Sequence, residues 1–293
     1  MVPMRPLEGI EKEMLSAFLR SDFGGGDPAS EAIVEIDGKA EINCGRDCVL
    51  SGLEAVDWIF RESGCVVDFE DGAVSGGMWV GGKRLSVIEG GVREILRGER
   101  TALNILSRMS GIATAASKAS DIARRASPGT RVAGTRKTTP GFGPFEKRAL
   151  IDGGALPHRM NLSQLAMLKD NHISAAGSEG IKGLVGSIRE RYGPYILIEL
   201  EAEDPDTAME GLDAGCDIIM LDNLPPERCG EISKMLKDRS RDLGRRVKIE
   251  ASGGITMEDI ADYAPHVDVI SMGSLTYGYD PVGFSMDMVR INK

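Results

Sequence analysis

The sequence has no long apolar run and only three histidines. None of its apolar runs approaches the roughly 20 residues that a membrane-spanning helix needs, so we expect no membrane partner. The N-terminal stretch MVPMRPLEGIEKEML has no long apolar core, which argues against a secretory signal and favours a cytoplasmic protein. The net charge of −10 argues against a nucleic-acid partner, so any anionic ligand must be small and held by a local cluster of cations.

Cysteine is also sparse, with five residues scattered along the chain. Cys44 and Cys48 are close in sequence, but no second pair stands at the spacing of zinc ligands. We therefore expect five reduced thiols rather than a zinc site.

The first hundred residues have mixed character. Residues 5–20 carry apolar side chains at helical spacing and predict an amphipathic helix. The run EAIVEIDGKAEINC alternates and is interrupted at Asp37–Gly38, which predicts a β-hairpin. Short strands are expected again over 65–88. Residues 1–100 thus form an α+β domain with antiparallel character.

After Gly98 the hydrophobic period becomes helical. We expect a helix over 99–126, with Arg100 near its start, and then strands that alternate with helices. The expected strands are at about 131–135, 165–169, 195–201, 217–221, 247–251 and 267–272. The expected helices between them are at about 144–152, 178–192, 204–214, 225–240 and 256–263. This alternation predicts a parallel sheet over 101–293.

Ionisable or glycine-rich residues follow every one of these strands. They are Arg136 with Lys137, Lys169, Glu201, Asp222 with Asn223, Ser252–Gly254, and Gly273 with Ser274. An open doubly wound sheet usually forms its site at one switch point, whereas an α/β barrel uses the carboxyl ends of many strands. Six contributing strands favour the barrel.

The segment from Gly134 to Ile173 concentrates positive charge. It is net +3, from six Lys and Arg against three acidic residues, in a chain of net −10. A solvated basic loop is the simplest interpretation. The pairs Arg136–Lys137 and His158–Arg159, separated by Gly/Pro turns, better suit several loops that converge on one anion.

Two further groups complement the cations. The stretches Ser252–Ile255 and Met272–Leu275 offer backbone N–H groups to a phosphate, although plain turn glycines would look the same. Glu201 and Asp222 suit ribose hydroxyls, a developing cation, or Mg²⁺ held mainly through substrate oxygens and water. Strand alternation turns Glu199 to the same face as Glu201, so the choice between them stays open. The whole describes a site for a sugar phosphate and a small polyanion.

The motifs GERTALNILSRMSGIAT, GTRKTTPG, EKRALIDGG, HR and LKDNHI, followed in order by LDN, ASGGI and GSLT, resemble the quinolinate phosphoribosyltransferase family. The resemblance spans nearly the whole chain. It implies an N-terminal α/β sandwich domain, an incomplete α/β barrel, and a tail from about residue 278 that packs back onto the first domain. It also implies a homodimer or larger assembly with shared sites. The implied reaction joins quinolinate to phosphoribosyl pyrophosphate with Mg²⁺, giving nicotinate mononucleotide, pyrophosphate and CO₂ for NAD biosynthesis.

The resemblance further implies roles for single residues. The residues that would hold the dicarboxylate are Arg136, His158, Arg159, Lys169 and, from a neighbouring subunit, Arg100. Those that would hold phosphates are Lys137, Ser252, Gly253, Gly254, Gly273 and Ser274. Glu201 and Asp222 would serve the ribose and Mg²⁺. The catalytic candidates are Glu201, Asp222, Lys137 and Lys169.

Three positions depart from the family's usual pattern. Ala155, Pro157 and Tyr277 stand where the family commonly has glycine, asparagine and the histidine of LTHS, and they leave substrate detail open. One alternative is a paralogue from molybdenum-utilisation loci with another anionic acceptor, which GGALPHR favours and LKDNHI disfavours. Another is a barrel lyase that forms a Schiff base on Lys137 or Lys169.

Overall fold

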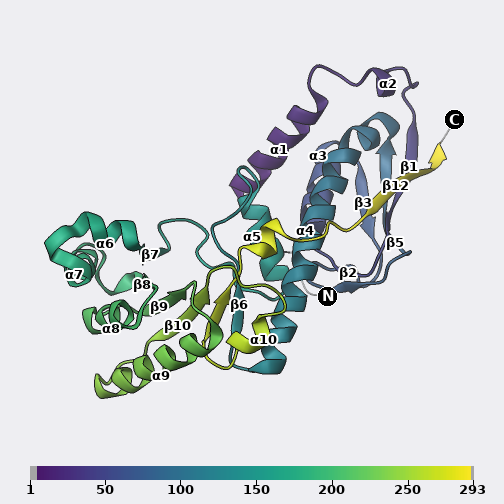
Figure 1. Cartoon of the computed structure of the whole chain (residues 1–293). Coiled ribbons are helices and arrows are strands. Elements are labelled where there is room, and N and C mark those ends of the chain that lie inside the picture. The colour runs from purple at the N-terminus through teal and green to yellow at the C-terminus, as the bar shows by residue number, and fades with distance from the viewer. Residues whose placement is uncertain (1–4, 292–293) are drawn as a thin grey trace. The chain divides into compact units, whose positions relative to one another are not determined.

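The computed structural model describes residues 5–291, which divide into two compact units (Figure 1). One unit comprises the described residues up to Ser117, Thr139–Gly154, and the chain from Gly278 onward. The other comprises Lys118–Thr138 and Ala155–Tyr277. Each unit contains its own sheet.

The first unit is built on a four-stranded antiparallel sheet of order β12-β1-β5-β3. Ala40, Ile42 and Cys44 alternate along β1 and are buried on one face of this sheet. Its strands are β1 (Asp37–Cys44), β3 (Val66–Phe69), β5 (Arg84–Gly91) and β12 (Phe284–Ile291). A separate antiparallel pair is formed by β2 (Cys48–Val49) and β4 (Met78–Trp79). The helices are α1 (Gly9–Phe23), α2 (Pro28–Glu31), α3 (Leu53–Glu62), the start of α4 (Val92–Ala126), and α5 (Gly143–Asp152).

The predicted β-hairpin at Asp37–Gly38 is wrong. Both residues lie inside β1, whose neighbours are β5 and β12. A Cβ on Gly38 would lie 2.9 Å from the carbonyl oxygen of Arg290, so this glycine allows a close approach of two strands and does not form a turn. Val34, on the supposed first arm of the hairpin, is 75% exposed.

Helix α4 begins at Val92, earlier than the expected start at residue 99. Val92 and Ile95 are buried and continue the apolar face towards the N-terminus, and the amide of Val92 donates to the carbonyl of Ile36. Arg100 therefore lies within the helix, and the expectation that it opens a helix is wrong. Although α4 has 35 residues, neither it nor any other helix between residues 5 and 291 is apolar enough to cross a membrane.

The second unit is a six-stranded sheet of order β6-β11-β10-β9-β8-β7, and all its pairings are parallel. Its last strand, β11, pairs with its first, β6, while β6 and β7 are the two edges. This is the predicted incomplete α/β barrel, and with the antiparallel sheet of the first unit it confirms the predicted fold class.

Helices alternate with the six strands and lie outside them (Figure 1). The strands are β6 (Arg131–Ala133), β7 (Leu165–Leu168), β8 (Leu197–Ala202), β9 (Ile218–Asp222), β10 (Lys248–Ser252) and β11 (Val269–Ser271). The helices are α6 (Asp170–Ala176), η1 (Gly177–Glu179), α7 (Gly180–Tyr192), η2 (Gly193–Tyr195), α8 (Pro205–Ala214), α9 (Pro226–Asp242), α10 (Ile260–Tyr263) and α11 (Ser274–Tyr277).

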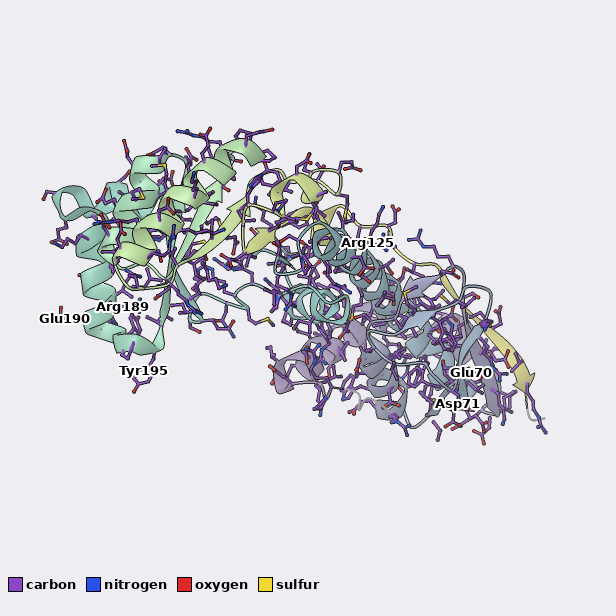
Figure 2. All side chains as sticks on the ribbon, turned by 90° about the horizontal axis from the view of Figure 1, so that it is seen from below. Glu70, Asp71, Arg125, Arg189, Glu190 and Tyr195 are labelled. Atoms are coloured by element: carbon purple, nitrogen blue, oxygen red, sulfur yellow. The ribbon has the colours of Figure 1, made fainter. Side chains whose placement is uncertain are left out.

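Arg189 on α7 fixes the start of β8, the strand that carries Glu201 at its other end. Its guanidinium donates to the carbonyl of Ile196 at 2.6 Å and to the carboxylate of Asp217 at 2.5 Å. Asp217 also accepts the backbone N–H of Ile198 at 2.8 Å. The adjacent Tyr195 points into solvent and is 95% exposed (Figure 2).

Two helical glycines predict opposite effects of the same substitution. A Cβ on Gly98 would lie 2.8 Å from the ring of Phe60, so overpacking of about 1–3 kcal/mol should exceed the gain of about 1 kcal/mol in helix propensity. A Cβ on Gly186 in α7 would meet nothing within 4 Å. We expect Gly98→Ala to lower the urea midpoint and Gly186→Ala to raise it. Movement of both midpoints in one direction would contradict this packing.

Candidate active site

One cavity of about 320 Å³ collects the carboxyl ends of all six barrel strands. Its wall consists of Thr135, Arg136, Lys137, His158, Arg159, Met167, Lys169, Glu201, Met220, Asp222, Ser252 and Ser271. In an α/β barrel this end carries the active site. Eight residues that the sequence predicted for the site share this cavity: Arg136, Lys137, His158, Arg159, Lys169, Glu201, Asp222 and Ser252.

Arg159 provides a buried positive charge that forms no ion pair in the described chain. It is 9% exposed, and its guanidinium donates to the carbonyl of Leu165 at 3.1 Å and contacts the sulfur of Met167 at 3.4 Å. No ion pair joins Arg159 or Arg136 to a carboxylate within residues 5–291. Burial, and then repulsion from Arg136, lowers the pKa of Arg159. Two guanidinium groups that repel one another beside a cavity form a site for an anion.

His158 lies against two buried glutamates. Its Nε2 is 3.5 Å from Oε2 of Glu199 and 3.3 Å from Oε1 of Glu250, which are exposed by 0% and 3%. These distances are long for hydrogen bonds but short for attraction between charges. Burial alone lowers the pKa of His158, but the two glutamates outweigh burial and raise it to about 9. Burial also raises the pKa of Glu199.

One backbone contact disfavours a positive charge on the imidazole of His158. The N–H of Arg159 points at Nδ1 of His158 at 2.8 Å, a contact that requires Nδ1 to lack a proton. Two buried carboxylates without a cation would cost far more than the loss of one contact between neighbouring residues. We therefore assign the imidazolium form at neutral pH. His158 also has a positive φ of 56°, which is uncommon for a non-glycine residue and is typical of functional sites.

Glu201 and Asp222 form the acidic side of the cavity. Lys169 Nζ is hydrogen-bonded to Glu201, and the side chain of Asn223 donates to Asp222 at 2.7 Å. Burial, and then repulsion from Glu201, raises the pKa of Asp222, so the two carboxylates act on one another. The backbone N–H of Lys169 donates to Nδ1 of His172 at 3.1 Å, which fixes the end of β7 and accounts for the KDNH pattern.

The loop that carries Lys137 contacts Thr276 and Gly273. The hydroxyl of Thr276 donates to the carbonyl of Lys137 at 2.7 Å, and a Cβ on Gly273 would lie 3.1 Å from the Lys137 side chain. No ion pair involves Lys137 within the part of the chain that the structure describes. Ser271, 2% exposed, adds a hydroxyl without a hydrogen-bond partner among these residues. This side of the cavity offers a cation and a hydroxyl to an oxygen-rich ligand.

Models of both domains of one family match the chain. The C-terminal domain of quinolinate phosphoribosyl transferase matches residues 112–287, and the N-terminal domain matches residues 27–110. The chain belongs to the quinolinate phosphoribosyl transferase family. The resemblance drawn from the motifs is thereby confirmed.

Relatives agree over nearly the full length. The probable nicotinate-nucleotide pyrophosphorylase [carboxylating] of Methanothermobacter thermautotrophicus is 37% identical over 280 residues, 94% of this chain and 98% of the relative. The human nicotinate-nucleotide pyrophosphorylase [carboxylating] is 40% identical over 241 residues, 82% of this chain and 78% of the relative. The crystal structure of NadC from Streptococcus pyogenes has a TM-score of 0.88 and 31% identity, covering 98% of this chain and 100% of that one.

Five residues that the family resemblance implied are not in the cavity wall: Arg100, Gly253, Gly254, Gly273 and Ser274. Arg100 belongs to the first unit, where its side chain is 63% exposed and lies 3.6 Å from Glu99. Gly253, with φ of 97°, passes so close to Asn223 that a Cβ would lie 2.5 Å from its backbone nitrogen. Gly253 thus allows the loop after β10 to pack closely against the loop after β9. Gly273 packs against the side chain of Lys137.

Sequence reasoning missed several members of the site. Thr135, Met167, Met220 and Ser271 line the cavity, and Glu250 lies beneath His158. A glutamate in the middle of the apolar strand KIEAS was the available signal for Glu250. The structure also separates the two glutamates of β8: Glu201 lines the cavity, and Glu199 is fully buried below it.

The three departures from the family's pattern have different surroundings, and one of them, Pro157, is half-buried immediately before His158. Ala155 is buried at 3% exposure, next to Leu156, which bridges to Ala133 of β6. Tyr277 is 60% exposed, and its hydroxyl donates to the carbonyl of Thr138 at 3.3 Å. Tyr277 therefore helps to hold the loop of Lys137.

The glutamate contacts of His158 should make stability depend on pH. The pKa of His158 is about 9 in the folded state and about 6.5 in the unfolded state, so the folded state binds this proton more tightly. The resulting stabilisation is fully present below pH 6.5 and is lost as the pH rises through 9. The contribution is on the order of 3 kcal/mol. We expect the difference in urea midpoint between wild type and His158→Gln to shrink from pH 6.5 to pH 9.5. A constant difference would contradict the imidazolium assignment.

Proposed function

We propose that this chain transfers the phosphoribosyl group of phosphoribosyl pyrophosphate to quinolinate and releases CO₂. The proposal rests on its membership of the quinolinate phosphoribosyl transferase family and on relatives named nicotinate-nucleotide pyrophosphorylase [carboxylating]. The product is nicotinate mononucleotide, for NAD biosynthesis. The observation that carries the proposal is the buried Arg159 beside Arg136, neither of them in an ion pair in the described chain, in a cavity whose other side holds Glu201 and Asp222. Such a cavity fits a small dianion next to a group that becomes positive.

The cationic side of the cavity would bind the two carboxylates of quinolinate. Arg159 and Arg136 present planar guanidinium groups that match carboxylates in bidentate fashion, and His158 adds a positive charge beside them. The buried carboxylates of Glu199 and Glu250 hold His158 in this charged form from behind. They are positioning residues, because they reach the ligand only through the imidazole.

The acidic side would bind the ribose and act on the first chemical step. The pyridine nitrogen attacks C1′ of the ribose while the bond from C1′ to pyrophosphate breaks, and positive charge develops on the sugar. Glu201 and Asp222 stabilise this charge in a site partly shielded from water. Lys137 and Ser271 lie where they can hold phosphate oxygens of the donor.

Magnesium fits this part of the site. Glu201 and Asp222 are hard oxygen ligands on adjacent strands, and their mutual repulsion would be relieved by a cation. They provide only two protein carboxylates, so most ligands would come from substrate and water. When bound, Mg²⁺ would neutralise charge on the leaving pyrophosphate.

The second step would break the bond between C2 of the pyridine ring and its carboxylate. CO₂ leaves, the electron pair stays on C2, and a proton then replaces the carboxylate. The positive charge of the new pyridinium nitrogen and the cations around the ring stabilise this electron pair. No covalent bond to the protein is needed.

The Schiff-base alternative loses support from the structure. Lys169 is 40% exposed and paired with Glu201, whereas a Schiff-base lysine is usually desolvated in an apolar pocket or placed next to another cation. The relatives that we compared are named as carboxylating pyrophosphorylases, which favours quinolinate over another acceptor. We further propose a cytoplasmic homo-oligomer.

A turnover assay tests the proposal. Wild type with Mg²⁺, phosphoribosyl pyrophosphate and quinolinate labelled in the 2-carboxylate should release labelled CO₂ and pyrophosphate in equal amounts. Glu201→Gln keeps the shape but removes the charge, so kcat should fall about tenfold to a hundredfold with little change in KM. Absence of labelled CO₂ from folded wild type would refute the proposal. An unchanged kcat in Glu201→Gln with a large loss in Glu199→Gln would move the transition-state role to Glu199.

Arg100 provides a test of shared sites. Its largely exposed side chain is available to quinolinate in a neighbouring subunit. Arg100→Ala and Lys169→Ala should each be inactive alone. After subunit exchange, about half of the dimers are mixed and each has one intact site, so activity should return to about a quarter of wild type. Activity that stays at the background of the two parents, despite proven exchange, would show that Arg100 acts within its own chain or not at all.

A further inference from the structure

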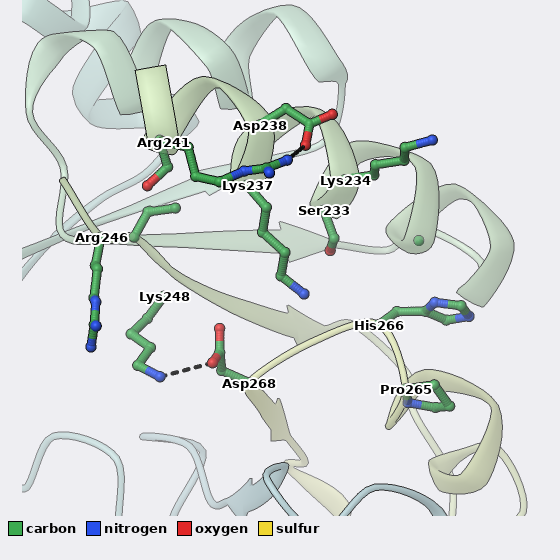
Figure 3. A pocket seen from close by; sticks show the side chains of 13 residues that line it. Ser233, Lys234, Lys237, Asp238, Arg241, Arg246, Lys248, Pro265, His266 and Asp268 are labelled. Atoms are coloured by element: carbon green, nitrogen blue, oxygen red, sulfur yellow. Dashed lines mark hydrogen bonds and ion pairs between the residues drawn. The ribbon is translucent and has the colours of Figure 1, made fainter. Parts of the chain in front are cut away.

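A second cavity lies at the other end of strand β10. The strand begins at Lys248, which lines this second cavity, and ends at Ser252, which lines the catalytic one. Four steps of about 3.3 Å place these residues about 13 Å apart. The second cavity has about 650 Å³ and lies between α9, the start of β10 and the segment before β11 (Figure 3). The proposed reaction uses none of its residues.

Positive charge dominates this second cavity. Its lysines and arginines are Lys234, Lys237, Arg241, Arg246 and Lys248, and its acidic residues are Asp238 and Asp268. Asp238 is paired with Arg241, and Asp268 with Lys248 at 2.8 Å. Within the described part of the chain, Lys234, Lys237 and Arg246 have no ion pair. Three cations without an ion pair thus line one cavity in a chain of net charge −10, and Figure 3 shows the side chain of Lys237 entering it.

Ser233 is an independent indication of a ligand. It is 2% exposed, lies in the wall of the second cavity, and its hydroxyl has no hydrogen-bond partner among residues 5–291. Figure 3 shows it pointing from α9 towards the space that the Lys237 side chain also enters. Buried hydroxyls almost always have a partner, and a ligand oxygen here would supply one.

The spacing of the cations indicates the length of the ligand. Lys234, Lys237 and Arg241 follow one another at three and four residues on one face of α9. The seven steps from Lys234 to Arg241 span about 10 Å along the helix, more than a single phosphate can bridge. We propose that the second cavity binds a linear polyphosphate, either free or as the triphosphate of a nucleotide, at a site separate from the catalytic cavity.

Calorimetric titration of the full chain tests this site. The background carries Arg136→Ala and Lys137→Ala, which remove two catalytic-site cations that have no ion pair. In this background, inorganic tripolyphosphate at physiological salt should bind with one site per chain. Adding Lys234→Gln, Lys237→Gln and Arg246→Gln should weaken binding at least tenfold. A matched control with Lys118→Gln, Arg125→Gln and Lys182→Gln removes the same charge from exposed helical positions, Arg125 being visible in Figure 2, and should change affinity less than twofold.

The binding results distinguish a nucleotide from free polyphosphate as the ligand, and they also define which results overturn the proposal. If ATP binds at least tenfold more tightly than tripolyphosphate, the nucleoside contributes and the ligand is a nucleotide; equal affinities indicate free polyphosphate. No saturable binding, or equal weakening by the two triple substitutions when circular dichroism shows both folded, overturns the proposal. Because the readout is binding in a background with a disabled catalytic cavity, failure here leaves the proposed reaction untouched.

Discussion

Repulsion between two guanidinium groups is the constraint on which the site depends. Arg159 is buried, Arg136 lies close enough to lower its pKa further, and neither forms an ion pair in the described chain, although Glu199 attracts Arg159 from a longer distance. A protein that buries such a charge usually pairs it, because an uncompensated ion in a medium of low dielectric costs several kcal/mol. We propose that the missing partner is the substrate. A dicarboxylate would supply two negative charges to the same cavity, and its binding would relieve the repulsion.

The barrel makes this arrangement possible by bringing six strand ends to one cavity. Acidic and basic groups come from different strands, so the cations and the pair Glu201–Asp222 face one another without neutralising each other completely. Alternation along β8 places Glu199 two residues deeper, where with Glu250 it supports His158. One strand therefore provides a residue that lines the cavity and a residue that positions another side chain.

Local patterns predicted much of this fold. Each of the six strands lies within a few residues of its predicted range, because apolar runs and turn residues are read over short distances. The predictions were wrong where contacts with residues distant in the sequence determine the local structure. The pairing of β1 with β5 and β12 placed Asp37–Gly38 inside a strand, and the bond from Val92 to Ile36 accompanies the early start of α4. Most cavity residues were predictable from their place after strands, whereas the role of Glu250 depends on where a separate loop places His158.

The most direct test of the central claim is equilibrium binding of pyridine acids in the absence of the ribose donor. If Arg159 and Arg136 form a dicarboxylate site, quinolinate should bind at least about tenfold more tightly than either pyridine monocarboxylate, since a charge-assisted contact contributes about 1.5–3 kcal/mol. Arg136→Ala should remove most of that preference. Equal affinities for quinolinate and the monocarboxylates in wild type would contradict the account.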